Sequence, residues 1–246
     1  ADANAVSTLT TVDLNGLGTV ENLSGIEFFT SLTYLNVSGN IIESVDLSSN
    51  TLLFYLDVSG NSLTSLDVSN NTKLGSLIVS NNNLTSLDVT ELIDLETLRC
   101  NSNQLSELNV TENTLLTELS CNFNSLVNLN LFSNTNLEQL YVESNSLEYL
   151  DLSQNTSLTT ITVILNSLIG LNIKNGNNTA ISNASFAAFD NPSLSCIQVD
   201  DVNYSNSNWA QIDMSSSYSE NCTPVNDDCS FPIPITLGQD TPGNTV

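Results

Sequence analysis

The chain repeats itself every 21 residues, and this period constrains its fold more than any other feature. The stretch from Leu66 to Val89 reads LDVSNNTKLGSLIVSNNNLTSLDV, so it begins and ends with the same three residues. Each unit has the form L-x-x-L-x-V-x-x-N-x-L-x-x-L-D-V-x-x-N-x-x, and the units start at Leu32, Leu53, Leu74, Leu95, Leu116, Leu137 and Leu158. A fixed period of this length predicts a solenoid in which each unit forms one coil.

Within each unit, the motif L-x-V occurs twice, and its alternation predicts a short strand or extended segment. Leucine and valine then point to one side of the segment, and the residue between them points to the other. A single coil cannot enclose a core, but stacked coils bury a continuous column of leucines. We therefore expect the first segments of successive coils to pair as a parallel β-sheet.

The L-x-x-L-x-L-x-x-N core resembles the leucine-rich repeat family, in particular its short bacterial versions. The stretch VENLSGIEFFTSLTYLNVSGN (20–40) is similar to internalin-type repeats, and LDVSNNTKL and LRCNSNQL are similar to 21-residue arrays of secreted Bacteroidetes proteins. The resemblance covers residues 9–222 and holds over all seven units. It implies a curved solenoid, with the parallel sheet on the concave face and short extended or turn segments on the convex side. In this family the concave sheet is the usual binding face.

Asparagines recur at two positions of the unit, where the chain is expected to turn. The first column comprises Asn40, Asn61, Asn82, Asn103, Asn124, Asn145 and Asn166. The second comprises Asn50, Asn71, Asn113, Asn134 and Asn155. A buried asparagine amide can bond turn backbone in its own coil and in the next. Leu92 and Gly176 interrupt the second column; we expect a local bulge at Leu92 and the end of regular coiling at Gly176.

The chain divides into four parts by this pattern. Residues 1–31 supply a first coil and a partial cap, and residues 32–178 hold seven repeats. Residues 179–222, with the only tryptophan, Trp209, are expected to cap the solenoid, whose last leucines would otherwise be exposed. Residues 223–246 read as a linker and the start of a β-rich domain, so we expect a monomeric fragment of a larger protein. The chain opens without methionine or a signal peptide, as a mature or trimmed product does.

The five cysteines fall into three groups. Cys100 and Cys121 lie 21 residues apart at an inward position, either as stacked core thiols or as a disulfide between coils. The cap resembles the closing segment of the Bacteroidetes arrays, which implies that NPSLSCIQVDD forms the last strand. Cys196 and Cys222 bracket that segment, so an extracellular setting favours a disulfide between them. Cys229 is then left over, with its partner beyond residue 246.

Composition argues against several classes of function. There are 27 acidic residues and three basic ones, for a net charge of −24, whereas nucleic acids and anionic membranes require clustered lysine and arginine. No apolar run approaches the roughly 18 residues of a membrane span. The absence of histidine excludes a Ser-His-Asp triad, and neither a phosphate loop nor a zinc-type cysteine cluster occurs. Glu118, Glu138 and Glu143 could face one another as paired carboxylates, but a chain this acidic produces such neighbours by chance. We expect no enzyme activity, cofactor or metal site.

Two outward positions of the unit differ sharply in their variability. The second L-x-V segment carries a nearly uniform ladder: Asp46, Asp67, Asp88, Asn109, Asn130, Asp151 and Asn172. This ladder either bonds a turn amide in each coil or gathers cations between neighbouring carboxylates. In the first segment no two coils agree: the residues are Asn36, Asp57, Ile78, Arg99, Ser120, Tyr141 and Thr162. This variability fits either an evolved recognition surface or drift on an inert scaffold.

We therefore predict a secreted or cell-surface, non-catalytic binding or adhesion module that recognises a protein or a glycan through its concave face. The residues expected to contact the ligand are Tyr34, Tyr55, Asp57, Ile78, Arg99, Glu118, Phe123 and Tyr141. The alternative is a spacer that presents an appended catalytic or carbohydrate-binding domain at the cell surface. Ice or mineral binding through threonine columns is a remote third interpretation.

Overall fold

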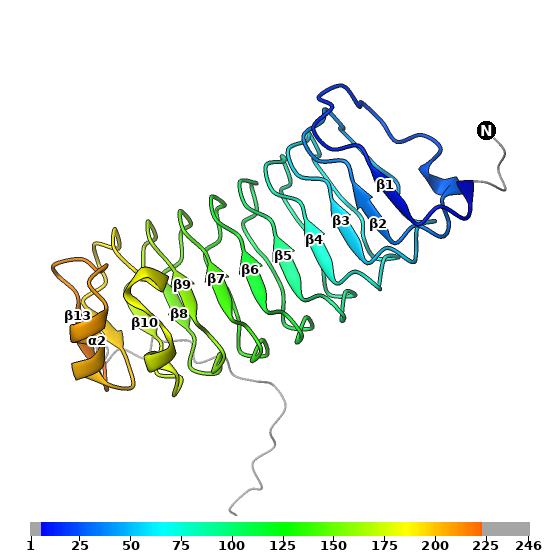
Figure 1. Cartoon of the computed structure of the whole chain (residues 1–246). Helices are drawn as coiled ribbons and strands as arrows, with labels where there is room; N and C mark the ends of the chain where they lie inside the picture. The colour runs from blue at the N-terminus through cyan, green and yellow to red at the C-terminus, as the bar shows by residue number, and fades with distance from the viewer. Residues whose placement is uncertain (1–5, 223–246) are drawn as a thin grey trace, which may run out of the picture.

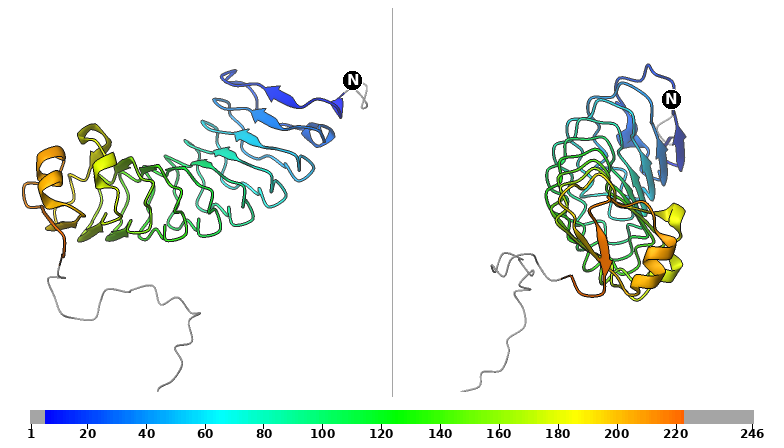
Figure 2. Two further views of the ribbon diagram at one scale, coloured as in Figure 1. Left: turned by 60° about the horizontal axis from the view of Figure 1, so that its bottom comes forward. Right: turned by 90° about the vertical axis from the view of Figure 1, so that its left-hand side faces the viewer.

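The computed structural model describes residues 6–222 and shows a single curved stack of coils (Figures 1 and 2). One long side of the stack is a nine-stranded parallel sheet in the order β1-β2-β3-β4-β5-β6-β7-β9-β11. Its strands are β1 (Thr11–Asp13), β2 (Tyr34–Asn36), β3 (Tyr55–Asp57), β4 (Ser76–Ile78), β5 (Thr97–Arg99), β6 (Glu118–Ser120), β7 (Gln139–Tyr141), β9 (Thr160–Thr162) and β11 (Phe186–Ala187). The solenoid predicted from the 21-residue period is thus confirmed, and so is the parallel sheet that the resemblance to leucine-rich repeats implied.

The register of this sheet follows the repeat without a slip from β2 to β9. Leu35 pairs with Leu56, Leu56 with Leu77, and the same step continues to the pair of Leu140 with Ile161. The unit-starting leucines from Leu32 to Leu158 and these strand-centre residues are completely buried. Because neighbouring strands lie about 4.8 Å apart, identical side chains stack directly and form one continuous core.

The second segments of the coils form strands only near the C-terminal end. There β8 (Tyr149–Asp151), β10 (Gly170–Asn172), β12 (Cys196–Gln198) and β13 (Ser217–Ser219) build a parallel sheet in the order β13-β12-β10-β8. In the earlier coils the corresponding segments contain no strand. This agrees with the expected mixture of extended and turn segments opposite the main sheet.

Leu92 does not form the bulge that the sequence suggested. Its N–H donates to Val89 O at 3.0 Å and its carbonyl accepts from Leu95 N at 3.1 Å. Asn71, one coil earlier, makes the same two turn bonds, to Val68 O and from Leu74 N. The turn geometry therefore comes from the backbone, and leucine fits the buried site that asparagine occupies elsewhere.

Gly176 lies where the 21-residue spacing of the repeats is interrupted, and that spacing returns between β12 and β13. Its φ of +79° lies in the left-handed region that favours glycine. The next coil holds two short 3₁₀ helices, η2 (Asn178–Ala180) and η3 (Asn183–Ser185). It lengthens the step between paired residues of the main sheet from 21 to 25 residues, Ile161 to Phe186. The other 3₁₀ helix among residues 6–222, η1 (Ile26–Phe28), lies in the first full coil.

An aromatic cluster covers the C-terminal end of the stack. Trp209 stacks on Phe186 with ring centroids 4.5 Å apart and meets Tyr204 and Tyr218 edge-on. Its indole N–H donates to Ile181 O at 2.9 Å. Helix α2 (Val202–Asn208) carries Tyr204 over this cluster. Aromatic packing thus covers the core where the leucine repeat stops.

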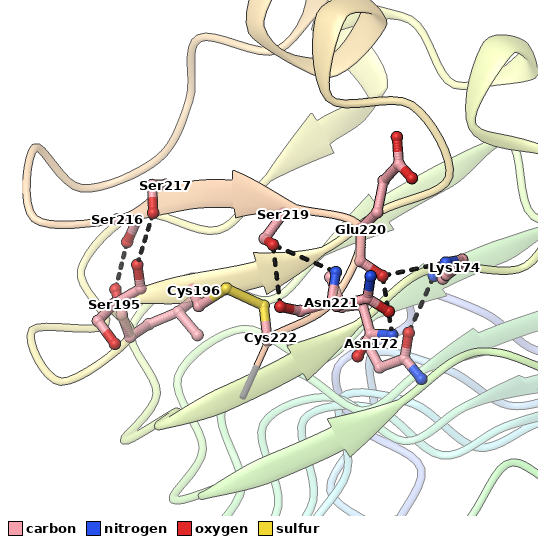
Figure 3. The surroundings of a disulfide bond; sticks show 12 residues. Asn172, Lys174, Ser195, Cys196, Ser216, Ser217, Ser219, Glu220, Asn221 and Cys222 are labelled. Atoms are coloured by element: carbon pink, nitrogen blue, oxygen red, sulfur yellow. Dashed lines mark hydrogen bonds between the residues drawn. A yellow bond between two sulfur atoms is a disulfide. The ribbon is translucent and has the colours of Figure 1, made fainter. Parts of the chain in front are cut away.

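The segment NPSLSCIQVDD forms β12, which is not the last strand as the resemblance implied. The last described strand is β13, which pairs with β12 in register, Ile197 opposite Tyr218. Cys196, at the start of β12, bonds Cys222, just past β13, with their Cα atoms 5.9 Å apart (Figure 3). This confirms the predicted disulfide, which closes a loop that would stabilise the end by about 3 kcal/mol on a chain-entropy estimate. Cys229 lies outside the described residues.

Candidate functional site

We define the sheet face as the outward side chains of the nine-stranded sheet. Seven of the eight residues predicted to contact a ligand lie on it: Tyr34, Tyr55, Asp57, Ile78, Arg99, Glu118 and Tyr141. The eighth, Phe123, lies in the loop that follows β6, beyond the end of the strand. The strand register places the seven side by side in consecutive coils, from β2 to β7.

Tyr34 and Tyr55 form a parallel aromatic stack at the N-terminal part of the sheet face. Their ring centroids are 4.5 Å apart and their planes differ by 7°. The residue opposite Tyr55 on its other side is Ser76, which is much smaller. Burial, followed by the nearby Asp57 carboxylate, raises the pKa of the Tyr55 phenol, so the phenol stays neutral and able to donate a hydrogen bond. The pair therefore offers both apolar surface and hydroxyls to a ligand.

Arg99 and Glu118 are joined across β5 and β6 as a bidentate ion pair. Arg99 Nε donates to Glu118 Oε1 at 2.6 Å, and Nη2 donates to Oε2 at 2.9 Å. The hydrogen bond with Glu118 raises the already high pKa of the Arg99 guanidinium. An acidic group of a ligand would have to displace the Glu118 carboxylate, so the Arg99 guanidinium is not freely available for binding. Glu118 is likewise committed to Arg99 rather than to a catalytic carboxylate pair.

Asp57 has a structural bond as well as a place on the sheet face. Its Oδ1 accepts from Ser59 N at 2.9 Å and from Ser59 Oγ at 2.6 Å, which closes the turn after β3. Asn36 makes the same pair of bonds with Ser38 one coil earlier. Variation at this position in the first coils is therefore limited by the turn.

In the middle coils, side chains two residues past each strand take over this turn-holding role. Ser80 Oγ accepts from Asn101 N at 3.2 Å, and Asn101 Oδ1 accepts from Asn122 N at 2.8 Å. Asn122 Oδ1 then accepts from Glu143 N at 2.7 Å, so each coil is tied to the next. Our sequence analysis missed this chain of bonds, although short polar residues at a fixed position were its visible sign. Because these bonds satisfy the N–H two residues after Arg99, Ser120 and Tyr141, the side chains of those strand residues are not needed to hold the turn.

The uniform ladder on the second segment has the turn-stabilising role. Every member accepts the backbone N–H two residues on, at 2.9–3.1 Å; the members are Asp46, Asp67, Asp88, Asn109, Asn130, Asp151 and Asn172. Hydrogen bonds from Ser48, Ser69 and Thr90 lower the pKa values of Asp46, Asp67 and Asp88. Residues 6–222 hold no group of three or more His, Cys, Asp or Glu side chains placed to bind a metal ion.

The two thiols of the core are free and fully buried, as stacked core residues would be. Burial raises the pKa of Cys100 to about 12 and raises that of Cys121 well above the usual range of a thiol. Neither thiol can therefore act as a nucleophile at ordinary pH. No helix within the described part of the chain is long and apolar enough to cross a membrane.

Solved structures similar to this chain are bacterial leucine-rich repeat proteins. The functional domain of InlJ from Listeria monocytogenes has 31% identity and a TM-score of 0.64, over 81% of this chain and 51% of that one. The internalin InlF of Listeria monocytogenes has 25% identity and a TM-score of 0.56, over 67% of this chain and 57% of that one. A leucine-rich repeat protein of Leptospira interrogans, at 18% identity and a TM-score of 0.61 over 88% and 67% of the two chains, shares the fold.

The chain thus spans about half the length of the two Listeria structures that it matches. No protein-family model matches the sequence, and no curated protein does. The assignment to leucine-rich repeats therefore rests on the repeat, on the coil geometry and on these structures.

Proposed function

Because the chain is a bacterial-type leucine-rich repeat solenoid with internalins among its structural neighbours, we propose that it is an extracellular, non-catalytic binding module. Its ligand is a protein or a glycan, bound on the sheet face. The three structures compared above carry the names of internalins or of a leucine-rich repeat protein and not of enzymes. The buried thiols and the paired Glu118 leave this face without an activated nucleophile.

The observation that carries this proposal is the Tyr34–Tyr55 stack. Both rings are only half-buried, although each coil has ample leucine for its core. Tyrosines are enriched at binding hot spots because they combine large rigid surfaces with a hydroxyl. Tyr141, whose hydroxyl donates to Gln139 Oε1 at 3.0 Å, offers a second aromatic contact farther along.

The disulfide and the charge support an extracellular location. Structural disulfides persist in oxidising compartments, and Cys196–Cys222 joins the last two described strands. With 27 acidic and three basic residues, the chain favours neutral glycans or basic protein surfaces over sulfated polysaccharides.

The test compares the purified chain with the triple variant Tyr34→Ala, Tyr55→Ala and Tyr141→Ala on a glycan array and against isolated surface proteins. Outward side chains contribute little to the core, so the variant should keep its fold and melting temperature. It should bind any ligand identified at least about 30-fold more weakly, as loss of even one hot-spot contact predicts. The matched control, Asp46→Asn with Asp67→Asn and Asp88→Asn, should bind normally.

Two outcomes would contradict this proposal. Binding that survives the tyrosine changes but is lost in the ladder control would place recognition elsewhere. If no glycan or surface protein binds, the spacer interpretation becomes the better one, since a rigid stack of coils can separate two domains without any ligand.

A further inference from the structure

Each loop that follows a strand of the main sheet from β2 to β9 contains one residue in the left-handed conformation. In five of these loops the residue is small: Gly39, Gly60, Asn81, Ser102 and Ser144. In two coils it is bulky and apolar, namely Phe123 with φ of 55° and Leu165 with φ of 53°. Side chains of this size rarely adopt the conformation, because the Cβ atom crowds the following carbonyl oxygen.

These two residues are also exposed. Phe123 is 52% exposed and Leu165 49% exposed, so neither is held in this conformation by burial in the core. Four residues farther along the same loops lie Val127 and Ile169, which are 46% and 44% exposed. Bulky residues in unfavourable backbone conformations cluster at functional sites, where another demand maintains them. The display of apolar surface to a partner is one such demand.

The coil between them breaks the apolar surface with acidic residues. Its loop carries Glu143 and Glu148 together with Ser144. We call the edge patch the set of Phe123, Val127, Leu165, Ile169, Glu143 and Glu148. The two glutamates have no ion-pair partner among residues 6–222, where the salt bridges are Lys73–Asp94 and Arg99–Glu118. Their charge is therefore open to a cation from outside.

The spacing of the edge patch follows from the sheet. Strands β6, β7 and β9 are consecutive neighbours (Figure 1), so the two apolar pairs lie two strand spacings apart, about 10 Å. Residues i and i+7 of an α-helix lie on one face about 10.5 Å apart. Same-face residues of an extended strand lie about 7 or 13 Å apart and do not match.

We propose that the edge patch binds a basic amphipathic helix of another protein. Two apolar side chains seven residues apart pack on the Phe123–Val127 pair and on the Leu165–Ile169 pair. Lysine or arginine between them faces Glu143 and Glu148. A second copy of this chain is a poor partner, because it would bring the same carboxylates and a net charge of −24.

The test uses a fluorescein-labelled helical peptide of about 18 residues, long enough to hold a helix. It carries two leucines seven residues apart and two lysines between them on the same face. Fluorescence anisotropy at low salt should show saturable binding to the chain, weakened by added salt. A peptide with glutamates in place of the lysines should bind at least about tenfold more weakly.

Phe123→Ser with Leu165→Ser should weaken binding of the lysine peptide at least about tenfold. Serine is the native residue at this position in two other coils, Ser102 and Ser144, so the variant should melt no lower than the wild type. Glu143→Gln with Glu148→Gln should remove most of the salt dependence. The triple tyrosine variant of the sheet face should bind the peptide normally, which separates this surface from the one proposed above.

Equal binding of the lysine peptide by the serine variant and by the wild type would overturn the inference. So would equal binding of the lysine and glutamate peptides, or failure of the wild type to bind the lysine peptide at millimolar concentration.

Discussion

The two asparagine columns look alike in the sequence but use different atoms of the amide. In the first column both ends are bonded: Asn82 Nδ2 donates to Val58 O and Val79 O, and its Oδ1 accepts from Leu63 N. In the second column only Nδ2 is bonded, and the Oδ1 atoms of Asn50, Asn71, Asn113, Asn134 and Asn155 have no partner. The first column is never interrupted from Asn40 to Asn166, whereas the second contains Leu92. The number of side-chain amide atoms that are hydrogen-bonded thus determines whether a repeated position tolerates a residue other than asparagine.

The uniform ladder on the second segment completes this comparison. Only its Oδ1 atoms accept the turn amide, so aspartate and asparagine serve equally, and both occur. Where only the side-chain Oδ1 is bonded, the position accepts Asp or Asn. Where only Nδ2 is bonded, it accepts Asn or an apolar residue. Where both atoms are bonded, it accepts only Asn. Three sets of variants test this rule.

The largest effect is expected from Asn82→Leu in the first column. The change leaves the Leu63 N–H without an acceptor in a buried turn, since Asn82 is only 7% exposed. It also removes one of the two amide donors to Val58 O, which keeps Asn61, and to Val79 O, which keeps Asn103. Loss of these bonds should lower the free energy of unfolding by about 3 kcal/mol or more. The melting temperature should fall by about 6–12 °C, as measured by circular dichroism or calorimetry. A variant that melts with the wild type would show that the first column does not hold the turns.

Asn71→Leu in the second column should cost less, about 1 kcal/mol. Leu47 O and Asn50 O lose one of their two donors but keep their backbone N–H donors. An unpartnered buried oxygen is also removed, and apolar surface is buried. Chemical denaturation of this variant beside Asn82→Leu measures the difference directly. Leu92→Asn is the matched reverse change and should shift stability by less than about 1 kcal/mol. Equal losses at Asn71 and Asn82 would refute the rule.

The smallest effect concerns the ladder and appears only in acid. The pKa values of Asp46, Asp67 and Asp88 are lower in the folded state than in the unfolded chain. These carboxylates therefore stabilise the fold at a pH above the unfolded value of about 3.9. That stabilisation is lost as the pH falls through their folded-state pKa values. Replacing all three with asparagine keeps the acceptor and removes the titration. Thermal melts at pH 7 should then nearly coincide, while below pH 4 the wild type should lose more stability than the variant. The same pH dependence in both proteins would mean that other carboxylates govern acid unfolding.

Much of the fold could be predicted because the 21-residue period is strict. The leucine column, the parallel register and the positions of Tyr34, Tyr55 and Arg99 on one face all follow from alternation and spacing. Leu92 was misjudged because its turn is set by backbone bonds that leucine can also make. Asn191 was missed because the longer coil puts it 25 residues after Asn166, although it makes the same bonds as the first column, accepting from Leu168 N and donating to Val163 O.

The candidate site could be predicted less well, because its chemistry depends on contacts between coils. The sequence places Arg99 and Glu118 on neighbouring strands but does not reveal that they form a bidentate pair. The sequence also led us to predict Phe123 on the sheet face, because its aromatic character was the only evidence that the sequence offered for this residue. Its left-handed conformation and its position at the loop edge are properties of the folded turn, and they made the edge patch recognisable.

The Cys196–Cys222 bond also determines how the solenoid would carry a mechanical load. Tension applied through the chain that follows Cys222 passes across the disulfide to Cys196 and enters the stack at β12. The intervening helix α2 and strand β13 lie within the closed loop, so they cannot be drawn out into an extended chain while the bond is intact. Lys174, whose Nζ donates to Glu220 O at 3.0 Å, braces the same corner against β10 (Figure 3). The disulfide therefore carries the force past the aromatic end cluster. After reduction of the disulfide, the cap would be the first part of the solenoid to unfold under tension.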